Sequence, residues 1–150
     1  MPNKNTHVFF GTAAGAIYAS SLSRDQETNY RIFEFIGGCL GGYVGSRLPD
    51  IINPANHSGH RAFAHSYLIG TVSAVSANEM TSLWVMTLRE MADYFKHCRH
   101  NEPTSDIHKD LCLLFEILMR IMAGIGPGLF AGYISHLALD ATTQRSLPLA

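Results

Sequence analysis

Four apolar runs dominate the chain, and three of them contain ionisable side chains. The runs are residues 8–22, 32–48, 67–88 and 111–139. Glu34 lies in the second run, Glu79 in the third, and Glu116, Arg120 and His136 in the fourth. Ionisable groups are costly in lipid, and within membrane segments they usually face protein or mark function. Two arrangements remain open: core helices of a compact domain, or a membrane-embedded or membrane-lying bundle whose polar groups face inward.

Composition limits the class of protein further. The 150 residues suggest one domain, residues 1–150, with enough chain to bury a core. Lys and Arg total 11 against 12 Asp and Glu, so we expect no general nucleic-acid binding. Charged residues make up 15% of the chain, which is low, while the apolar share of 47% is ordinary. The chain is poor in charge rather than unusually hydrophobic, and its low charge makes a homo-oligomer a further expectation.

Helical signals recur along the chain, and strand signals are weak because period-two runs and hairpin pairs are missing. We predict an all-α, single compact bundle of about six helices. The first helix is expected to begin near residue 5 or 6 and to end before residue 24. The others are expected over about 28–45, 60–77, 78–97, 104 or 105–122, and 129–142. Asn78 is predicted to cap the fourth helix, and Gly124–Gly128 with Pro127 to separate the last two. Residues 50–59 are predicted to form a loop after Pro49.

Five glycines of the second run, at residues 37, 38, 41, 42 and 45, are spaced by three and four. This spacing favours a smooth helix face against which another helix packs closely. The first run resembles the core of a signal peptide, but its glycines and the serines that follow it favour a helix of the mature fold.

The three cysteines, Cys39, Cys98 and Cys112, are odd in number and have no close paired spacing. They therefore indicate neither a disulfide framework nor a thiolate zinc site, and they favour a reducing compartment.

Histidine is abundant, with eight residues in a chain so poor in other charge. One cluster follows Asp50 and consists of His57, His60 and His65. Further along, His136 lies four residues before Asp140, which places both side chains on one helix face. Imidazole and carboxylate at this spacing suit a divalent ion, although a helix-face hydrogen bond is an ordinary alternative. His97, His100 and His108 lie in a polar stretch that is typical of a solvated loop. The candidate metal ligands are His7, Asp50, His60, His65, His136 and Asp140.

Four segments in the same order resemble a bacterial family, the LexA-regulated, membrane-bound metal-dependent hydrolases. Residues 45–51, Gly-Ser-Arg-Leu-Pro-Asp-Ile, are similar to its Leu-Pro-Asp-Ile segment, and residues 60–66 to its His-Arg-Gly-x-Thr-His-Ser signature. Residues 132–140 resemble its Gly-Tyr-x-Ser-His-x-x-x-Asp element, and residues 6–8 its opening Thr-His. Ile52 stands where the family usually has a second aspartate, and Ala64 replaces a threonine. A more distant analogy leads to the all-helical zinc phospholipase C and nuclease group.

The resemblance implies a metal-dependent hydrolase that is cytoplasmic or associated with the inner membrane, and it names no substrate. We expect zinc as the ion, and the low charge and apolar body of the chain favour a phospholipid or another phosphate ester as the substrate. Such an enzyme would be a phosphodiesterase or phospholipase. Arg61 would hold a phosphate or form an ion pair with Asp50, and Ser66 would orient His65 or cap a turn. The competing hypothesis is a non-enzymatic, membrane-associated or assembly protein with a structural metal or a buried histidine network. A pH-responsive histidine switch is a third alternative.

Overall fold

The computed structural model describes residues 4–52, 67–101 and 105–141, and for residues 67–78 and 101 it describes the backbone alone. These ranges form four long helices and one short helix, without a strand, so the all-α prediction is confirmed. The helices are α1 (Lys4–Leu22), α2 (Thr28–Gly45), α3 (Leu48–Ile52), α4 (Tyr67–Asn101) and α5 (Asp106–Ala141).

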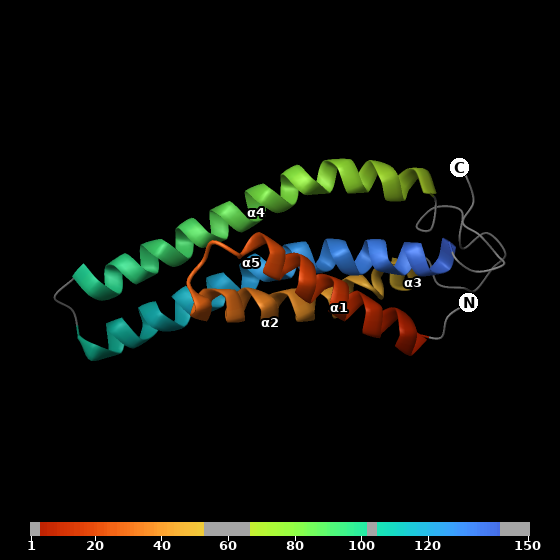
Figure 1. The fold of residues 1–150 in the computed structure, drawn as a ribbon. Helices are drawn as coiled ribbons and strands as arrows, with labels where there is room; N and C mark the ends of the chain where they lie inside the picture. Colours follow the sequence, from red (N-terminus) through yellow and green to blue (C-terminus); the bar gives the residue numbers. More distant parts are fainter. Residues whose placement is uncertain (1–3, 53–66, 102–104, 142–150) are drawn as a thin grey trace.

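The helices make an elongated bundle in which α5 contacts every other helix (Figure 1). Helices α1 and α2 pack on each other and on α5. Helix α4 packs along α5 and reaches the rest of the described chain through side chains such as Arg89. The beginning of α1, all of α3 and the end of α5 gather at one end of the bundle, while the end of α4 and the start of α5 lie at the other (Figure 1).

The glycines of α2 form two rows, one for each neighbouring helix. Gly38 and Gly42 lie against α1, where a Cβ on either residue would clash with backbone of Gly15 or Gly11. The second row lies against α5 and consists of Gly37, Gly41 and Gly45. The predicted close packing is therefore confirmed, and it brings three backbones together with almost no side-chain filling.

The prediction of about six helices is wrong, because two expected breaks do not occur. Asn78 lies inside the continuous helix α4. Pro127 lies inside the continuous helix α5, although proline lacks the N–H that would bond the carbonyl of Ala123. Of the glycines beside Pro127, Gly128 leaves room for α2 and Gly126 leaves room for Trp84 of α4, so both neighbouring helices pack closely on α5 around the proline. Trp84 Nε1 also donates a hydrogen bond of 2.8 Å to the neighbouring carbonyl of Met122.

A short helix replaces the start of the predicted loop after Pro49. Residues 50–52 belong to α3, with Pro49 as its second residue. Proline is tolerated in the first turn of a helix, where its missing N–H has no intrahelical partner to lose. The expected helix start at residue 60 lies outside the described residues, which resume at Tyr67.

Burial in the bundle is inverted relative to a water-soluble protein. The largest fully buried side chains include His136, Glu34 and Asp140. The buried apolar residues are mostly small, whereas many large apolar side chains are exposed, among them Phe9 at 69% and Ile17 at 70%. In water this arrangement would expose a large apolar surface and bury charge at high cost. In lipid it is the expected arrangement, because the charged groups then pair inside the bundle.

Candidate metal centre

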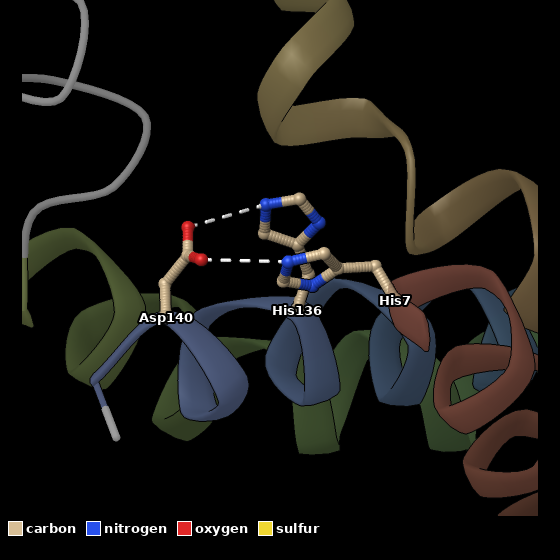
Figure 2. A group of neighbouring side chains, drawn as sticks. All are labelled: His7, His136 and Asp140. Carbon is tan, nitrogen blue, oxygen red and sulfur yellow. Dashed lines mark ion pairs between the residues drawn. The ribbon is translucent and has the colours of Figure 1, made fainter. Parts of the chain in front are cut away.

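Three candidate ligands meet at the end of the bundle where α1 begins and α5 ends. His7 lies in the first turns of α1, and His136 and Asp140 lie one turn apart near the end of α5. All three side chains are buried. Figure 2 shows both imidazoles facing the Asp140 carboxylate, one from each helix. The close approach of α1 to α5 therefore joins two sequence segments that are far apart in the chain.

The distances within this group are longer than those of strong hydrogen bonds. His7 Nε2 lies 3.4 Å from Asp140 Oδ1, and His136 Nε2 lies 3.5 Å from Asp140 Oδ2. The two imidazole rings stack with centroids 4.1 Å apart and planes inclined by 26°. A charge-assisted N–H···O bond is usually about 2.7–2.9 Å long. The contacts of Asp140 with the two imidazoles are thus ion-pair distances rather than short hydrogen bonds.

A backbone carbonyl fixes the orientation of His136. Its Nδ1 lies 2.6 Å from the carbonyl oxygen of Ser46, where α2 ends. Because a carbonyl only accepts hydrogen bonds, Nδ1 carries the proton and donates it to Ser46. With Nδ1 engaged in this way, Nε2 is the ring nitrogen that faces the carboxylates of Asp140 and Asp50. Metal-binding histidines commonly have their second nitrogen held in this way.

A fourth candidate, Asp50, lies beside the buried group at its exposed edge. Asp50 Oδ1 is 3.7 Å from His136 Nε2, and the Asp50 side chain is 51% exposed. It comes from α3, which follows directly on the chain that carries Ser46. Helix α3 therefore places one more carboxylate between the buried group and the surroundings of the bundle.

The donor set and its spacing fit a divalent ion such as zinc. One ligand atom from each of His7, His136 and Asp140 can be chosen so that all lie within 4.8 Å of one another. Zinc binds imidazole nitrogen and carboxylate oxygen at about 2.0–2.2 Å, so tetrahedral ligand atoms lie roughly 3.4 Å apart. The nitrogen-to-oxygen separations of 3.4 and 3.5 Å match this spacing.

The remaining predicted site residues lie outside the described residues. These are His60, Arg61, His65 and Ser66. Of the six predicted ligands, the structure thus brings together His7, Asp50, His136 and Asp140. Sequence reasoning missed Ser46, since a carbonyl that holds a distant histidine leaves no side-chain pattern to recognise.

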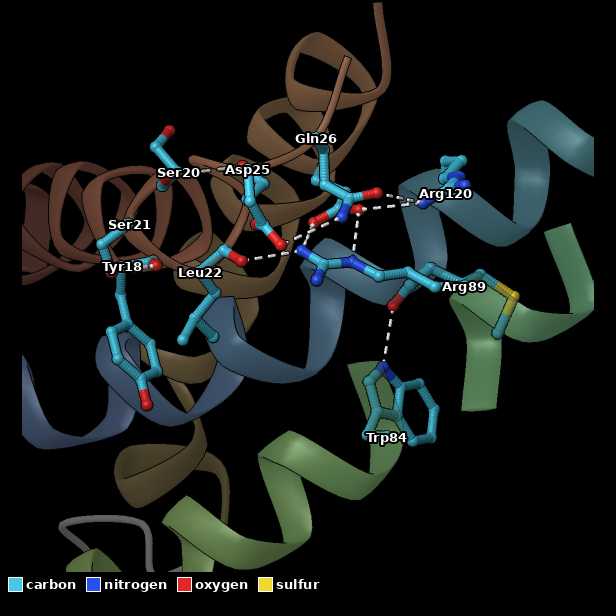
Figure 3. A network of polar contacts seen from close by, with 12 residues as sticks. Tyr18, Ser20, Ser21, Leu22, Asp25, Gln26, Trp84, Arg89 and Arg120 are labelled. Carbon is cyan, nitrogen blue, oxygen red and sulfur yellow. Dashed lines mark hydrogen bonds and ion pairs between the residues drawn. The ribbon is translucent and has the colours of Figure 1, made fainter. Parts of the chain in front are cut away.

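A second polar cluster lies toward the opposite end of the bundle and has a different character. Arg89 donates hydrogen bonds of 2.9 and 2.7 Å to the two carboxylate oxygens of Glu34, and one of 2.9 Å to the carbonyl of Leu22. Arg120 bonds to Gln26 and to Asp93 and lies 3.7 Å from Glu34 (Figure 3). The charged groups that interrupt the apolar runs at residues 34 and 120 therefore face inward, as expected.

Comparison with known families decides between the two arrangements that the sequence leaves open. A family model described as YdjM inner membrane protein matches residues 1–150. The chain belongs to this family. Membership of the YdjM family accounts for the inverted burial and supports the membrane-associated arrangement with inward polar groups. Comparison with curated proteins and with solved structures gave no match.

The membrane assignment agrees with the character of α5. Within the described residues, α5 is the helix that is long and apolar enough to cross a membrane by length and composition. The expectation of a cytoplasmic or inner-membrane protein is confirmed as an inner-membrane one, and the resemblance is confirmed as far as a bacterial membrane-protein family.

Proposed function

We propose that this YdjM-family protein is a metal-dependent hydrolase of the inner membrane, with a divalent ion, zinc by preference, held by His7, His136, Asp140 and Asp50. The observation that carries the proposal is the spacing of the buried group. Two imidazole nitrogens face one carboxylate at 3.4 and 3.5 Å, too far to pair strongly and at the spacing of ligands around one ion.

The chain's own residues prepare this site. Ser46 holds His136 in the tautomer that leaves Nε2 available, and stacking on His136 orients the His7 ring. The buried position of Asp140 keeps its carboxylate out of water, which strengthens its attraction for a cation. When bound, the ion would lower the pKa of a water molecule attached to it and would polarise the scissile oxygen of the substrate.

A phosphate ester, and in particular a phospholipid, is the substrate class that this setting supports. The site lies at the end of a bundle with exposed apolar side chains, in a protein of the inner membrane. Asp50 marks the exposed edge from which a substrate reaches the buried ligands. Arg61 as a phosphate-binding group and Ser66 as a support for His65 remain predictions from the sequence, as do His60 and His65 as further ligands.

Metal content of the purified protein is the first test. Wild type should contain stoichiometric zinc or another divalent ion, His136→Ala should lose it, and His97→Ala, which changes an exposed histidine, should retain it. The loaded protein should then hydrolyse a phosphodiester or phospholipid, and a chelator or His136→Ala should abolish the reaction. Wild type that binds no ion after reconstitution would overturn the proposal.

The second candidate function is a non-enzymatic membrane protein with a structural metal. Burial of His7, His136 and Asp140 favours it, because structural zinc is usually closed off by four protein ligands, whereas a catalytic zinc keeps an open position. Stoichiometric metal whose removal lowers stability, together with no hydrolysis of phosphodiesters or phospholipids, would establish this alternative and exclude the hydrolase.

A further inference from the structure

A cavity of about 300 Å³ lies between the start of α2, the end of α4 and the first turns of α5. It is lined by charged side chains of both signs and by apolar ones. Along α5, Glu116 in this cavity and Asp140 in the metal centre are separated by roughly 36 Å of helix. This length exceeds the hydrocarbon core of a bilayer, about 30 Å, and is less than the full thickness with headgroups. With the metal centre at one headgroup level, the cavity lies at the other.

The charges in the cavity form two ion pairs. Arg99 Nη2 lies 3.1 Å from Glu116 Oε2, and Lys96 Nζ lies 3.2 Å from Glu27 Oε1. Hydrogen bonding to the Tyr30 hydroxyl, and then to Glu27, raises the pKa of Lys96. Two cations therefore stand beside two anions, so the cavity does not select for a ligand that carries a net charge.

The buried pair keeps unused hydrogen-bonding capacity. Glu116 is buried, and its Oε1 accepts a hydrogen bond of 2.8 Å from the Tyr30 hydroxyl. Within the described part of the chain, Arg99 Nε and Glu116 Oε2 are buried atoms without a hydrogen-bond partner. Glu116 Oε2 thus has its ion pair with Arg99 but no aligned hydrogen bond, and Arg99 Nε has no acceptor. Buried polar atoms normally find hydrogen-bond partners.

The apolar part of the cavity is continuous with the outer surface of the bundle. Phe33, Leu113 and Ile117 line it. Leu114 and Leu118, on the same turns of α5, are exposed large apolar residues. A hydrocarbon chain that covers this surface in the membrane would extend directly into the cavity.

We propose that this cavity binds one zwitterionic phospholipid whose headgroup joins a phosphate to a primary ammonium. The phosphate contacts Arg99 and Lys96, the ammonium donates to Glu116 and Glu27, and an acyl chain lies over Phe33, Leu113 and Ile117. An anionic headgroup would leave the two carboxylates facing excess negative charge. A quaternary ammonium has no N–H to donate to Glu116. The site is separate from the metal centre and does not depend on hydrolysis.

Native mass spectrometry of the full-length, metal-free protein in detergent tests the proposal. The lipids are dioleoyl phosphatidylethanolamine, phosphatidylcholine and phosphatidylglycerol, added at equal concentration. We expect one phosphatidylethanolamine to bind at least about tenfold more tightly than either of the others, as loss of a charge-assisted hydrogen bond predicts. Equal binding of the three lipids, preference for phosphatidylglycerol or phosphatidylcholine, or binding of none would overturn the proposal.

Variants locate the bound lipid. Arg99→Met should weaken phosphatidylethanolamine binding by about tenfold or more, and Lys96→Met should weaken it in the same direction. Lys109→Met is the matched control, since Lys109 is an exposed lysine of α5 that does not line the cavity. Because Lys96 lies near the surface, Lys96→Met should fold even if Arg99→Met does not. Unchanged binding in a folded Lys96→Met, or a loss equal to that of Lys109→Met, would contradict the site.

Discussion

The two polar clusters of this bundle differ in how their charged groups are satisfied. In the Arg89–Glu34–Arg120 cluster, cations and carboxylates meet in short hydrogen bonds, such as those of 2.7 and 2.9 Å between Arg89 and Glu34. In the metal centre, the imidazoles lie 3.4 and 3.5 Å from Asp140, and all these groups are common metal ligands. The first cluster is therefore held by short charge-assisted hydrogen bonds, although Arg120 Nε has no hydrogen-bond partner among the described residues. The second cluster has wider spacings, which we propose a bound cation occupies.

The largest expected effect comes from breaking the Arg89–Glu34–Arg120 cluster. Arg120→Met removes the buried cation shared by Gln26 and Asp93, close to Glu34. We expect the free energy of unfolding in detergent to fall by about 3 kcal/mol, as for a buried ion pair that loses one member. Arg31→Met, at an exposed arginine of α2, is the control and should leave stability nearly unchanged. Equal stability of the two variants would show that the Arg120 contacts contribute little.

Metal addition sharpens the comparison, because only the candidate metal centre should respond to zinc. Zinc at about a hundred times its dissociation constant should stabilise the wild type by roughly 2.7 kcal/mol. His136→Ala should show no such gain, whereas Arg120→Met should show the same gain from a lower baseline. Thermal unfolding with and without zinc or a chelator measures the zinc-dependent gain in stability of each variant. A zinc-dependent gain in His136→Ala equal to that of the wild type would place the ion elsewhere.

The glycine rows of α2 lie between Glu34 of the first cluster and Ser46, which holds His136. A wider spacing between α2 and its neighbouring helices should therefore disturb both clusters. A Cβ on Gly42 would meet the backbone of Gly11 and Thr12. Gly42→Ala should therefore cost about 1–3 kcal/mol of stability, as overpacking does, and should weaken zinc binding because α1 carries His7. Val44→Ala, at an exposed position of the same helix, is the control for denaturant unfolding and zinc titration. A stability loss without any change in zinc affinity would show that the close packing of α1 on α2 does not position the ligands of the metal centre.

The smallest expected effect concerns the attachment of α4. Trp84→Phe keeps an aromatic ring against Gly126 but removes the hydrogen bond to the Met122 carbonyl. We expect a loss of about 0.5–1.5 kcal/mol in denaturant unfolding, with zinc affinity unchanged because the metal centre lies on α1, α3 and α5. Reduced zinc affinity in this variant would show that α4 acts on the metal centre.

Parts of this architecture could be predicted from sequence because their signals are local. The spacing of His136 and Asp140 on one helix face, and the two interleaved glycine rows of α2, are visible in short segments. The helix ranges 4–22 and 28–45 likewise follow from apolar runs bounded by a polar stretch. Such patterns survive folding because neighbours along one helix keep their relation.

The rest could not be predicted because it depends on contacts between distant segments. The pairing of Arg89 with Glu34 joins residues 55 apart, and the hydrogen bond from His136 to Ser46 joins residues 90 apart. The continuity of α5 through Pro127 also depends on its neighbours, since the proline signal by itself favours a break. In a membrane bundle, packing and backbone hydrogen bonding override that local signal.

X-ray absorption at the zinc edge of the reconstituted, full-length protein identifies the ligands of the proposed metal centre. We predict a first shell of nitrogen and oxygen alone at about 2.0–2.2 Å, with outer-shell scattering from imidazole that is reduced in His7→Ala. Sulfur scattering at about 2.3 Å would place the ion on cysteine instead. That result would contradict a metal centre built from His7, His136 and Asp140.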